Sequence, residues 1–268
     1  MDILSIFFPT SYAYMERITT SETIDPIFLV KEKKRRFIHE LYEIQCQIFQ
    51  GVDLNSFTSY IIRPGAVRTR VKIFRNDHQK AVGYYAIHLF EIRSNADKIT
   101  AIFRAEAGLL RAYRRKHATL SFAFAEYCRY KCFHPGRKVY YLGTLVHPSS
   151  YHSLFRNCSE LYPTYRRETP PDILRLMCDM AKNLGIGPAC RDNPFIIQVG
   201  WIVRNDREDL AFWSHCDKPD VKFFLKINPG YREGEGLLTL VPITWKNLLW
   251  VFIRWTTEVC RRELRKLA

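Results

Sequence analysis

Hydrophobic and polar positions along the chain follow two periods, and each period predicts a different kind of element. Over residues 31–51, apolar side chains such as Phe37 and Leu41 recur every three or four positions, which predicts an amphipathic helix. Apolar and polar residues alternate instead over 70–75 and again over 81–90, which predicts a β-hairpin. In chain order, the remaining pattern predicts a strand at 98–110, a helix at 118–132, a strand at 139–146, helices at 149–161 and 171–185, strands at 195–203 and 221–227, and a helix at 245–266. This mixture places the chain in the α/β class.

The composition is that of a globular protein. The 268 residues are 47% hydrophobic and 14% aromatic, which is too apolar for a disordered chain. No stretch approaches the roughly 18 apolar residues that a membrane span needs. The eight cysteines form no C-x-x-C pair and mostly lie in apolar helical patterns, which favours buried thiols in a reducing compartment. The N-terminus lacks the features of a signal peptide, so we expect a cytoplasmic protein.

The charge is strongly positive. Lys and Arg number 41 against 27 Asp and Glu, giving a formal net charge of +14, which suits nucleic acid, an anionic membrane or a phosphate-rich cofactor, or serves solubility alone. Basic residues cluster at 31–36, 111–116 and 261–266. The middle cluster lies between a predicted strand and a predicted helix start, where free N–H groups and the helix dipole stabilise phosphate. It therefore points to a phosphate-bearing ligand. Few aromatic residues interleave it, so we do not expect nucleic acid.

The run from Ala107 to Thr119, AGLLRAYRRKHAT, resembles the acetyl-CoA-binding segment of the GCN5-related N-acetyltransferase (GNAT) superfamily, where a strand ends in a Y-R-x-x-G-x-G/A loop that opens a helix. The order of predicted elements over about 30–165 is also similar to that superfamily. The resemblance implies a mixed, mainly antiparallel sheet flanked by helices. It further implies an acyl-CoA-binding core at 1–165 and a C-terminal α/β extension at 166–268 that completes the sheet and the acceptor side. The implied co-substrate is acyl-CoA, with no covalently bound cofactor, and the implied CoA-binding residues are Leu109, Leu110, Arg111, Arg114, Arg115, Lys116, His117, Ala118 and Thr119.

The CoA-binding segment departs from the GNAT pattern at two positions. His117 and Thr119 stand where the superfamily has small residues, which let the backbone approach the pyrophosphate. Either this loop binds CoA in an altered pose, or the protein is a relative that has lost acetyl-CoA binding. Residues 41–49, LYEIQCQIF, are similar to a helix of GNAT-fold enzymes that use long acyl chains, the acyl-homoserine-lactone synthases and N-acyl amino acid synthases. That similarity favours a larger acyl group.

Acyl transfer from a thioester to an amine needs a base for the amine proton, and the leaving thiolate benefits from an acid. Glu106 lies near the end of the strand before the basic loop, where members of the superfamily carry a general base. The alternative is a strand carboxylate that pairs with Arg104 or Arg111. Tyr151 and Tyr162 are the candidate acids, because they flank the helix on which the superfamily places a thiolate-protonating tyrosine. The alternative is that both tyrosines pack in the core.

The predicted function is therefore transfer of an acyl group from acyl-CoA, or from the acidic acyl carrier protein, to an amine on a small molecule or a protein. Cys128, Cys132 and His134 are spaced loosely like metal ligands, but without a fourth ligand we expect no metal site. The final helix is apolar in its first half and basic at its end, so it can pack on the body, form a dimer contact or lie on an anionic membrane. The rival interpretations are a non-catalytic GNAT-fold protein that binds an anionic ligand or partner, and a basic nucleic-acid or membrane-surface binder.

Overall fold

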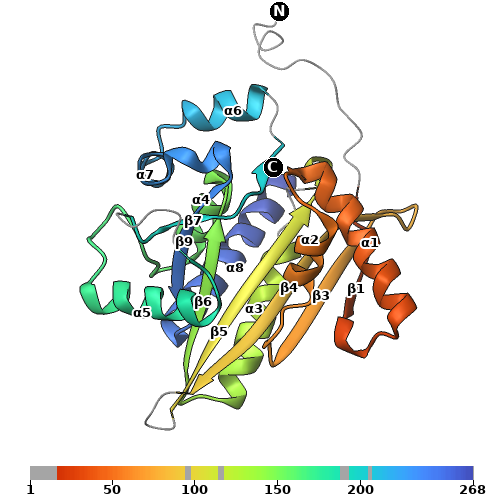
Figure 1. The fold of residues 1–268 in the computed structure, drawn as a ribbon. Helices are drawn as coiled ribbons and strands as arrows, with labels where there is room; N and C mark the ends of the chain where they lie inside the picture. The colour runs from red at the N-terminus through yellow and green to blue at the C-terminus, as the bar shows by residue number, and fades with distance from the viewer. Residues whose placement is uncertain (1–16, 94–97, 114–117, 188–192, 205–206, 268) are drawn as a thin grey trace, which may run out of the picture.

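The computed structural model describes residues 17–93, 98–113, 118–187, 193–204 and 207–267, and Figure 1 shows their arrangement. Helices and strands mix along the whole chain. The elements are β1 (Thr20–Ile24), η2 (Pro26–Phe28), α1 (Lys31–Ile48), β2 (Phe49–Gln50), α2 (Leu54–Ile61), β3 (Arg68–Arg75), β4 (Ala81–Arg93), β5 (Ile99–Leu109), η3 (Arg111–Tyr113), α3 (Ala118–Phe133), β6 (Lys138–Leu145), α4 (Pro148–Asn157), α5 (Pro171–Asn183), β7 (Ile196–Gln198), β8 (Ile202–Val203), α6 (Arg207–Ser214), α7 (Pro219–Ile227), η4 (Pro229–Glu233), β9 (Glu235–Pro242) and α8 (Trp245–Leu267).

The main sheet has seven strands in the order β1-β3-β4-β5-β6-β9-β7. Neighbouring strands run antiparallel, except for β5 and β6, which are parallel and are connected by α3. The predicted α/β class and the mixed, mainly antiparallel sheet flanked by helices are confirmed. β9 and β7 come from the second half of the chain and extend the sheet beyond β6. The division of the chain at residue 165 stays a prediction.

The two central strands, β5 and β6, lie side by side over only part of their length. Thr100–Phe103 of β5 pairs with Lys138–Tyr141 of β6. Beyond that point β5 continues to Leu109 while paired with β4, and β6 continues to Leu145 while paired with β9. Over residues 104–109, therefore, no strand in the described part of the chain covers the second edge of β5.

Helices cover both faces of the sheet (Figure 1). α1 and α2 pack over β3 and β4 on one face, and α5 covers the same face farther along. α3, α4, α7 and α8 pack on the opposite face. Because side chains alternate between faces along a strand, Ile102 belongs to the core beneath α5 while Ala101 and Phe103 belong to the core beneath α3. The same alternation directs Arg104 and Glu106 to the face of α1, α2 and α5.

Two of the predicted strands are wrong. Residues 221–227 lie in helix α7, which begins at Pro219 and buries Val221 and Phe224 at helical spacing. Over 195–203 the prediction merges two separate strands. β7 joins β9 in the main sheet, β8 pairs with β2, and Gly200, with a φ of +78°, turns the chain between them. The other predicted helices and strands are confirmed with small shifts at their ends, whereas β1, α2, α6 and β9 were not predicted.

Candidate active site

A cavity of about 1050 Å³ lies where β5 and β6 separate. Its wall includes the open edge of β5 from 104 to 107, Tyr141 and Thr144 of β6, and Thr119 in the first turn of α3. Residues of α4, α6 and α8 close it on other sides. The cavity therefore combines an unpaired strand edge, a helix start and ionisable side chains in one place.

Glu106 lies in the wall of this cavity between two arginines. Its side chain is 16% exposed, and its Oε1 lies 3.4 Å from Nη2 of Arg63 and 3.7 Å from Nη2 of Arg104. Arg63 follows α2 and stacks on the ring of Tyr60, with 4.2 Å between Cζ and the ring centroid. The alternative to a general base was a strand carboxylate that pairs with Arg104 or Arg111, and the contact with Arg104 is present. This carboxylate, however, also lines a cavity and is largely buried. The Glu106 carboxylate can therefore contact a ligand as well as the two arginines.

Arg104 and His88 lie beside each other on β5 and β4 and are both buried. Within the described residues, Nε and Nη1 of Arg104 and Nε2 of His88 have no hydrogen-bond partner, whereas Nδ1 of His88 lies 3.0 Å from Oγ1 of Thr69. Burial lowers the pKa of Arg104; Glu106 opposes this change and Arg63 adds to it. Burial and the two arginines lower the pKa of His88 to about 3, so its ring is neutral at physiological pH. The cluster thus holds two guanidinium groups against one carboxylate.

The two tyrosines predicted as acids lie away from the cavity. The hydroxyl of Tyr151 donates a hydrogen bond to the carbonyl of Pro163 at 3.0 Å, and its ring packs among the aromatic side chains of α4 and α7. The hydroxyl of Tyr162 donates to Glu160 at 2.7 Å and accepts from Arg167 at 2.8 Å. Neither side chain is among the described residues that line the cavity. Both positions fit the core-packing alternative.

Besides Tyr60, described above, three tyrosines line the cavity: Tyr85, Tyr127 and Tyr141. Burial raises the pKa of each, so their hydroxyls are protonated at neutral pH. Tyr141 is the last residue of β6 that pairs with β5, and its ring lies over Gly143, where a Cβ would collide with the hydroxyl. The sequence analysis did not identify these tyrosines. Tyr141 and Gly143 lie two residues apart on the same face of one strand, and this pattern could have indicated an aromatic ring that lies over a glycine.

The residues predicted to bind CoA lie around the end of β5 and the start of α3. Leu109, Arg111 and Thr119 line the cavity, whereas the backbone N–H of Leu110 donates to the carbonyl of Val82 on β4 at 3.0 Å. Ala118 is the first residue of α3. Arg114, Arg115, Lys116 and His117 lie outside the described residues. The described part of the segment therefore reaches the cavity from the helix start, and the roles of these residues stay predictions.

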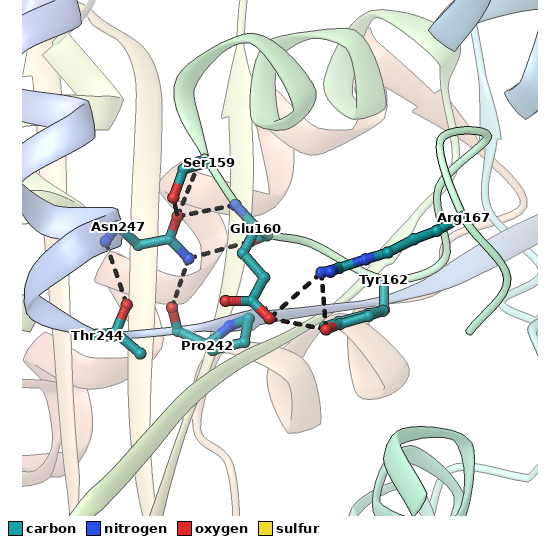
Figure 2. A network of polar contacts seen from close by, with 7 residues as sticks. All are labelled: Ser159, Glu160, Tyr162, Arg167, Pro242, Thr244 and Asn247. Atoms are coloured by element: carbon teal, nitrogen blue, oxygen red, sulfur yellow. Dashed lines mark hydrogen bonds and ion pairs between the residues drawn. The ribbon is translucent and has the colours of Figure 1, made fainter. Parts of the chain in front are cut away.

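Asn247, at the start of α8, fixes another wall of the cavity (Figure 2). Its Oδ1 accepts hydrogen bonds from the N–H and hydroxyl of Ser159 at 2.8 and 2.7 Å and from the N–H of Glu160 at 3.0 Å. Its Nδ2 donates to the carbonyls of Glu160 and Pro242 at 3.0 and 2.7 Å. The residue is 2% exposed. A single buried amide thus joins α8, the end of β9 and the segment after α4.

No protein-family model and no curated protein sequence matches this chain. Similar solved structures include NAA60 of Arabidopsis thaliana in complex with acetyl-CoA, at 15% identity and TM-score 0.36 over 53% of this chain and 89% of that one. An acetyltransferase from Vibrio fischeri is 17% identical at TM-score 0.30 over 46% and 94% of the two chains. A probable N-acyltransferase from Enterococcus faecalis is 10% identical at TM-score 0.36 over 53% and 33%. At TM-scores below 0.5, these similarities transfer no residue roles to this chain.

Proposed function

We propose that this protein transfers the acyl group of an acyl-CoA to an amine, and that its fold is that of the GNAT superfamily. The observation that carries the proposal is the separation of β5 from β6 beside a cavity into which Glu106 points. The separation gives an extended ligand a strand edge to lie on. The carboxylate gives an amine a group that accepts its proton.

The open edge of β5 suits the pantetheine arm of CoA, an extended chain that carries amide groups. Leu110 donates its N–H to β4. Because alternate residues of an antiparallel strand bond the same neighbour, the backbone groups of Ala105 and Ala107 face the other way, into the cavity. An extended ligand can add to such an edge as a further strand. Its phosphates would then reach the start of α3, where Arg111 and Thr119 line the cavity and the helix dipole favours anions.

The reaction follows from this placement. The amine nitrogen attacks the thioester carbonyl carbon, and Glu106 accepts the proton that the nitrogen loses. The tetrahedral intermediate then breaks its C–S bond, and the leaving CoA thiolate takes a proton from a hydroxyl. We assign that hydroxyl to Tyr141, because it lies where β5 and β6 begin to separate and interacts electrostatically with Glu106. The proton on Glu106 returns to Tyr141 through solvent, so the products are an amide and CoA thiol.

The size of the cavity favours an acyl group longer than acetyl. Its volume of about 1050 Å³ is at the upper end of the roughly 300–1,000 Å³ usual for small-molecule sites. Beyond the strand edge the wall includes apolar side chains such as Leu145, Val199, Trp201 and Leu248. A thioester of acyl carrier protein would present the same reacting group and is the second candidate donor.

Calorimetric titration with acetyl-, octanoyl- and palmitoyl-CoA tests the proposal. We expect all three to bind, and the longer chains to bind at least tenfold more tightly, because each buried methylene contributes about 0.8 kcal/mol. Ala107→Trp should weaken binding of every acyl-CoA at least tenfold by filling the open edge. Ala211→Trp, on an exposed position of α6 outside the cavity, is the matched control. Absence of binding to any acyl-CoA would exclude an acyl-CoA-dependent enzyme. Binding without release of thiol in the presence of amines would favour the non-catalytic GNAT-fold alternative.

We also propose that α8 lies on an anionic membrane. Its exposed residues include Trp245, Leu249, Trp250, Phe252, Ile253 and Trp255, with exposed fractions from 43% to 58%. Among the described helices, none is long and apolar enough to cross a membrane. An apolar helix face on a chain of net charge +14 matches the interface of an anionic bilayer, where aromatic side chains bury and basic ones meet headgroups. The cytoplasmic location stays a prediction.

Co-sedimentation with vesicles measures this contact. We expect binding to phosphatidylcholine vesicles that contain phosphatidylglycerol, weaker binding at high salt, and at least tenfold weaker binding for Leu249→Glu. Phe28→Glu, at an 85% exposed position outside α8, should bind like the wild type. If the wild type does not bind these vesicles and is a dimer that Leu249→Glu dissociates, the face is a dimer contact and the membrane proposal is wrong.

A further inference from the structure

A serine, a histidine and an aspartate lie in series in the cavity wall, where the chain passes from β6 to α4. Nδ1 of His147 lies 2.7 Å from Oγ of Ser149, and Nε2 of the same ring lies 3.3 Å from Oδ2 of Asp209 on α6. All three residues line the cavity. The side chains of His147 and Asp209 are 8% and 23% exposed. A nucleophile beside a base, with a third group behind the base, is the arrangement that activates a serine hydroxyl.

The hydrogen bonds of the histidine ring identify the nitrogen that can take a proton. The backbone N–H of Ser149 donates to Nδ1 of His147 at 3.3 Å, so Nδ1 carries a lone pair and the ring proton lies on Nε2. Nδ1 can therefore accept the hydroxyl proton of Ser149. The positively charged ring that results has the carboxylate of Asp209 beside its other nitrogen. Each ring nitrogen thus lies next to the group that this proton transfer needs.

Aromatic residues hold the ring and the carboxylate in place. The ring of His147 makes edge contacts with the rings of Trp213 and Tyr231, at centroid distances of 5.8 and 6.4 Å. Nε1 of Trp213 donates to Oδ1 of Asp209 at 3.2 Å, and the other oxygen, Oδ2, is the one 3.3 Å from His147. The orientation of the base therefore does not depend on a bound ligand.

Capping of α4 explains only one of these contacts. His147 is the N-cap residue of α4 and accepts a hydrogen bond from the backbone N–H of Ser149. That bond requires neither the Ser149 hydroxyl nor a carboxylate behind the ring. Serine, threonine, asparagine and aspartate are the usual N-cap residues, and none of them takes up and returns a proton near neutral pH as histidine does.

The cluster is separate from the proposed site of amide formation. Tyr141 lies where β6 leaves β5, and β6 continues from there to Leu145 before the chain reaches His147. Four residues of a strand span about 13 Å. A carbonyl group at Ser149 therefore occupies a different part of the cavity from one at Glu106.

We propose that Ser149 is the nucleophile of a hydrolytic site that cleaves an acyl ester or thioester, with His147 as its base and Asp209 as the positioning residue. Ser149 is only partly buried and lines the cavity, so a substrate there can contact it. Phe212 and Trp213 also line the cavity and offer an apolar surface to the acyl chain. Hydrolysis at Ser149 is independent of the proposed transfer to an amine, because no amine takes part.

The reaction is a hydrolysis in which water is the second substrate. Oγ of Ser149 attacks the carbonyl carbon and gives its proton to Nδ1 of His147. The bond from that carbon to the leaving sulfur or oxygen breaks, the leaving atom takes the proton from Nδ1, and an acyl ester of Ser149 remains. Water then attacks the acyl carbon and gives a proton to Nδ1, and the bond to Oγ breaks as Oγ takes that proton back. The products are a carboxylic acid and a thiol or alcohol, and nothing is oxidised or reduced.

Hydrolysis in the absence of an amine tests the inference. The release of p-nitrophenol from p-nitrophenyl octanoate and of thiol from octanoyl-CoA is measured with the wild type. The protein is then treated with a fluorophosphonate, which modifies activated serines. We expect both substrates to be hydrolysed and mass spectrometry to find the phosphonate on Ser149. Turnover of only one substrate would assign the site to oxygen esters or to thioesters.

Substitutions locate the activity in the cluster. Ser149→Ala and His147→Asn should each lower kcat for hydrolysis about 10²-fold or more, and asparagine still caps α4. Asp209→Asn should lower kcat but leave KM within about threefold, and Asp209→Glu should restore part of the activity, because the carboxylate acts through the ring. Ser150→Ala replaces the adjacent serine, which also lines the cavity, and as the matched control should hydrolyse both substrates like the wild type.

The outcomes separate this inference from the proposed function. The inference is wrong if the wild type hydrolyses neither substrate, if Ser149→Ala hydrolyses them like the wild type, or if the phosphonate lies on another residue. Thermal unfolding at the Tm of the wild type shows that a variant is folded. If no acyl-CoA binds but p-nitrophenyl octanoate is hydrolysed through Ser149, the proposed function fails and the hydrolytic site stands. Acyl-CoA binding and amide formation without hydrolysis would give the opposite result.

Discussion

Glu106→Gln should lower kcat for acyl transfer by about 10²–10⁴-fold, the range that a positioned general base contributes. The substitution keeps the size of the side chain and its position between Arg63 and Arg104, but an amide cannot accept the amine proton. The dissociation constant for acyl-CoA, measured by calorimetry, should change by less than about threefold, because the proposed binding place of the thioester is the edge of β5 and not the carboxylate.

The pH dependence separates a base from a residue that only holds the arginines in place. As pH rises toward the pKa of the amine, about 10.4 for an alkylamine such as the lysine side chain, a growing share of the amine reaches the site already neutral. The deficit of Glu106→Gln should therefore shrink with rising pH, whereas a purely structural defect would persist. Glu43→Gln, at an exposed position of α1, is the control for the change of charge. Turnover that matches the wild type at neutral pH would remove Glu106 from the role of base.

The sequence predicts the part of this site that is built from consecutive elements of the chain. Strand 98–110, helix 118–132 and strand 139–146 follow one another directly. Their hydrophobic periods, with the basic loop between the first two, place Glu106 near the end of a strand and beside the start of a helix. The structure confirms these elements as β5, α3 and β6. Short-range patterns are sufficient to predict these elements and their arrangement, because each element lies next to the one that follows it in the chain.

The rest of the site depends on residues distant in sequence, which periodicity does not connect. Arg63 approaches Glu106 across 43 positions because α2 folds over the sheet, and α2 itself was not predicted. The pattern of 221–227 fits a strand and a helix equally, and only the packing of Val221 and Phe224 decides for α7. The sequence of β9 is almost uninterruptedly apolar, because both faces of this strand are buried. Apolar and polar positions therefore do not alternate along it, and periodicity does not predict the strand.

Asn247→Leu should be the most destabilising of the substitutions considered. The leucine has a similar volume, so little cavity forms, but the five hydrogen bonds of the amide are lost (Figure 2). Each buried group left without a partner costs about 1–3 kcal/mol, and backbone groups of Ser159, Glu160 and Pro242 are left so. We expect a loss of about 4 kcal/mol or more in the free energy of unfolding. At this chain length that corresponds to a fall in Tm of about 10 °C.

Two further variants identify the cause of the loss. Asn247→Asp keeps an oxygen for the three bonds from Ser159 and Glu160 but loses the two donated by Nδ2, so its Tm should lie between those of the wild type and Asn247→Leu. Asn55→Leu, at an exposed position of α2, should change the free energy of unfolding by less than about 0.5 kcal/mol. Equal Tm values for Asn247→Leu and the wild type in thermal unfolding would show that the network does not hold α8 to the sheet. Because Asn247 and the apolar side chains of Leu248 and Val251 on the same helix line the cavity, a destabilised but folded Asn247→Leu should lose more affinity for long-chain acyl-CoA than for acetyl-CoA relative to the wild type.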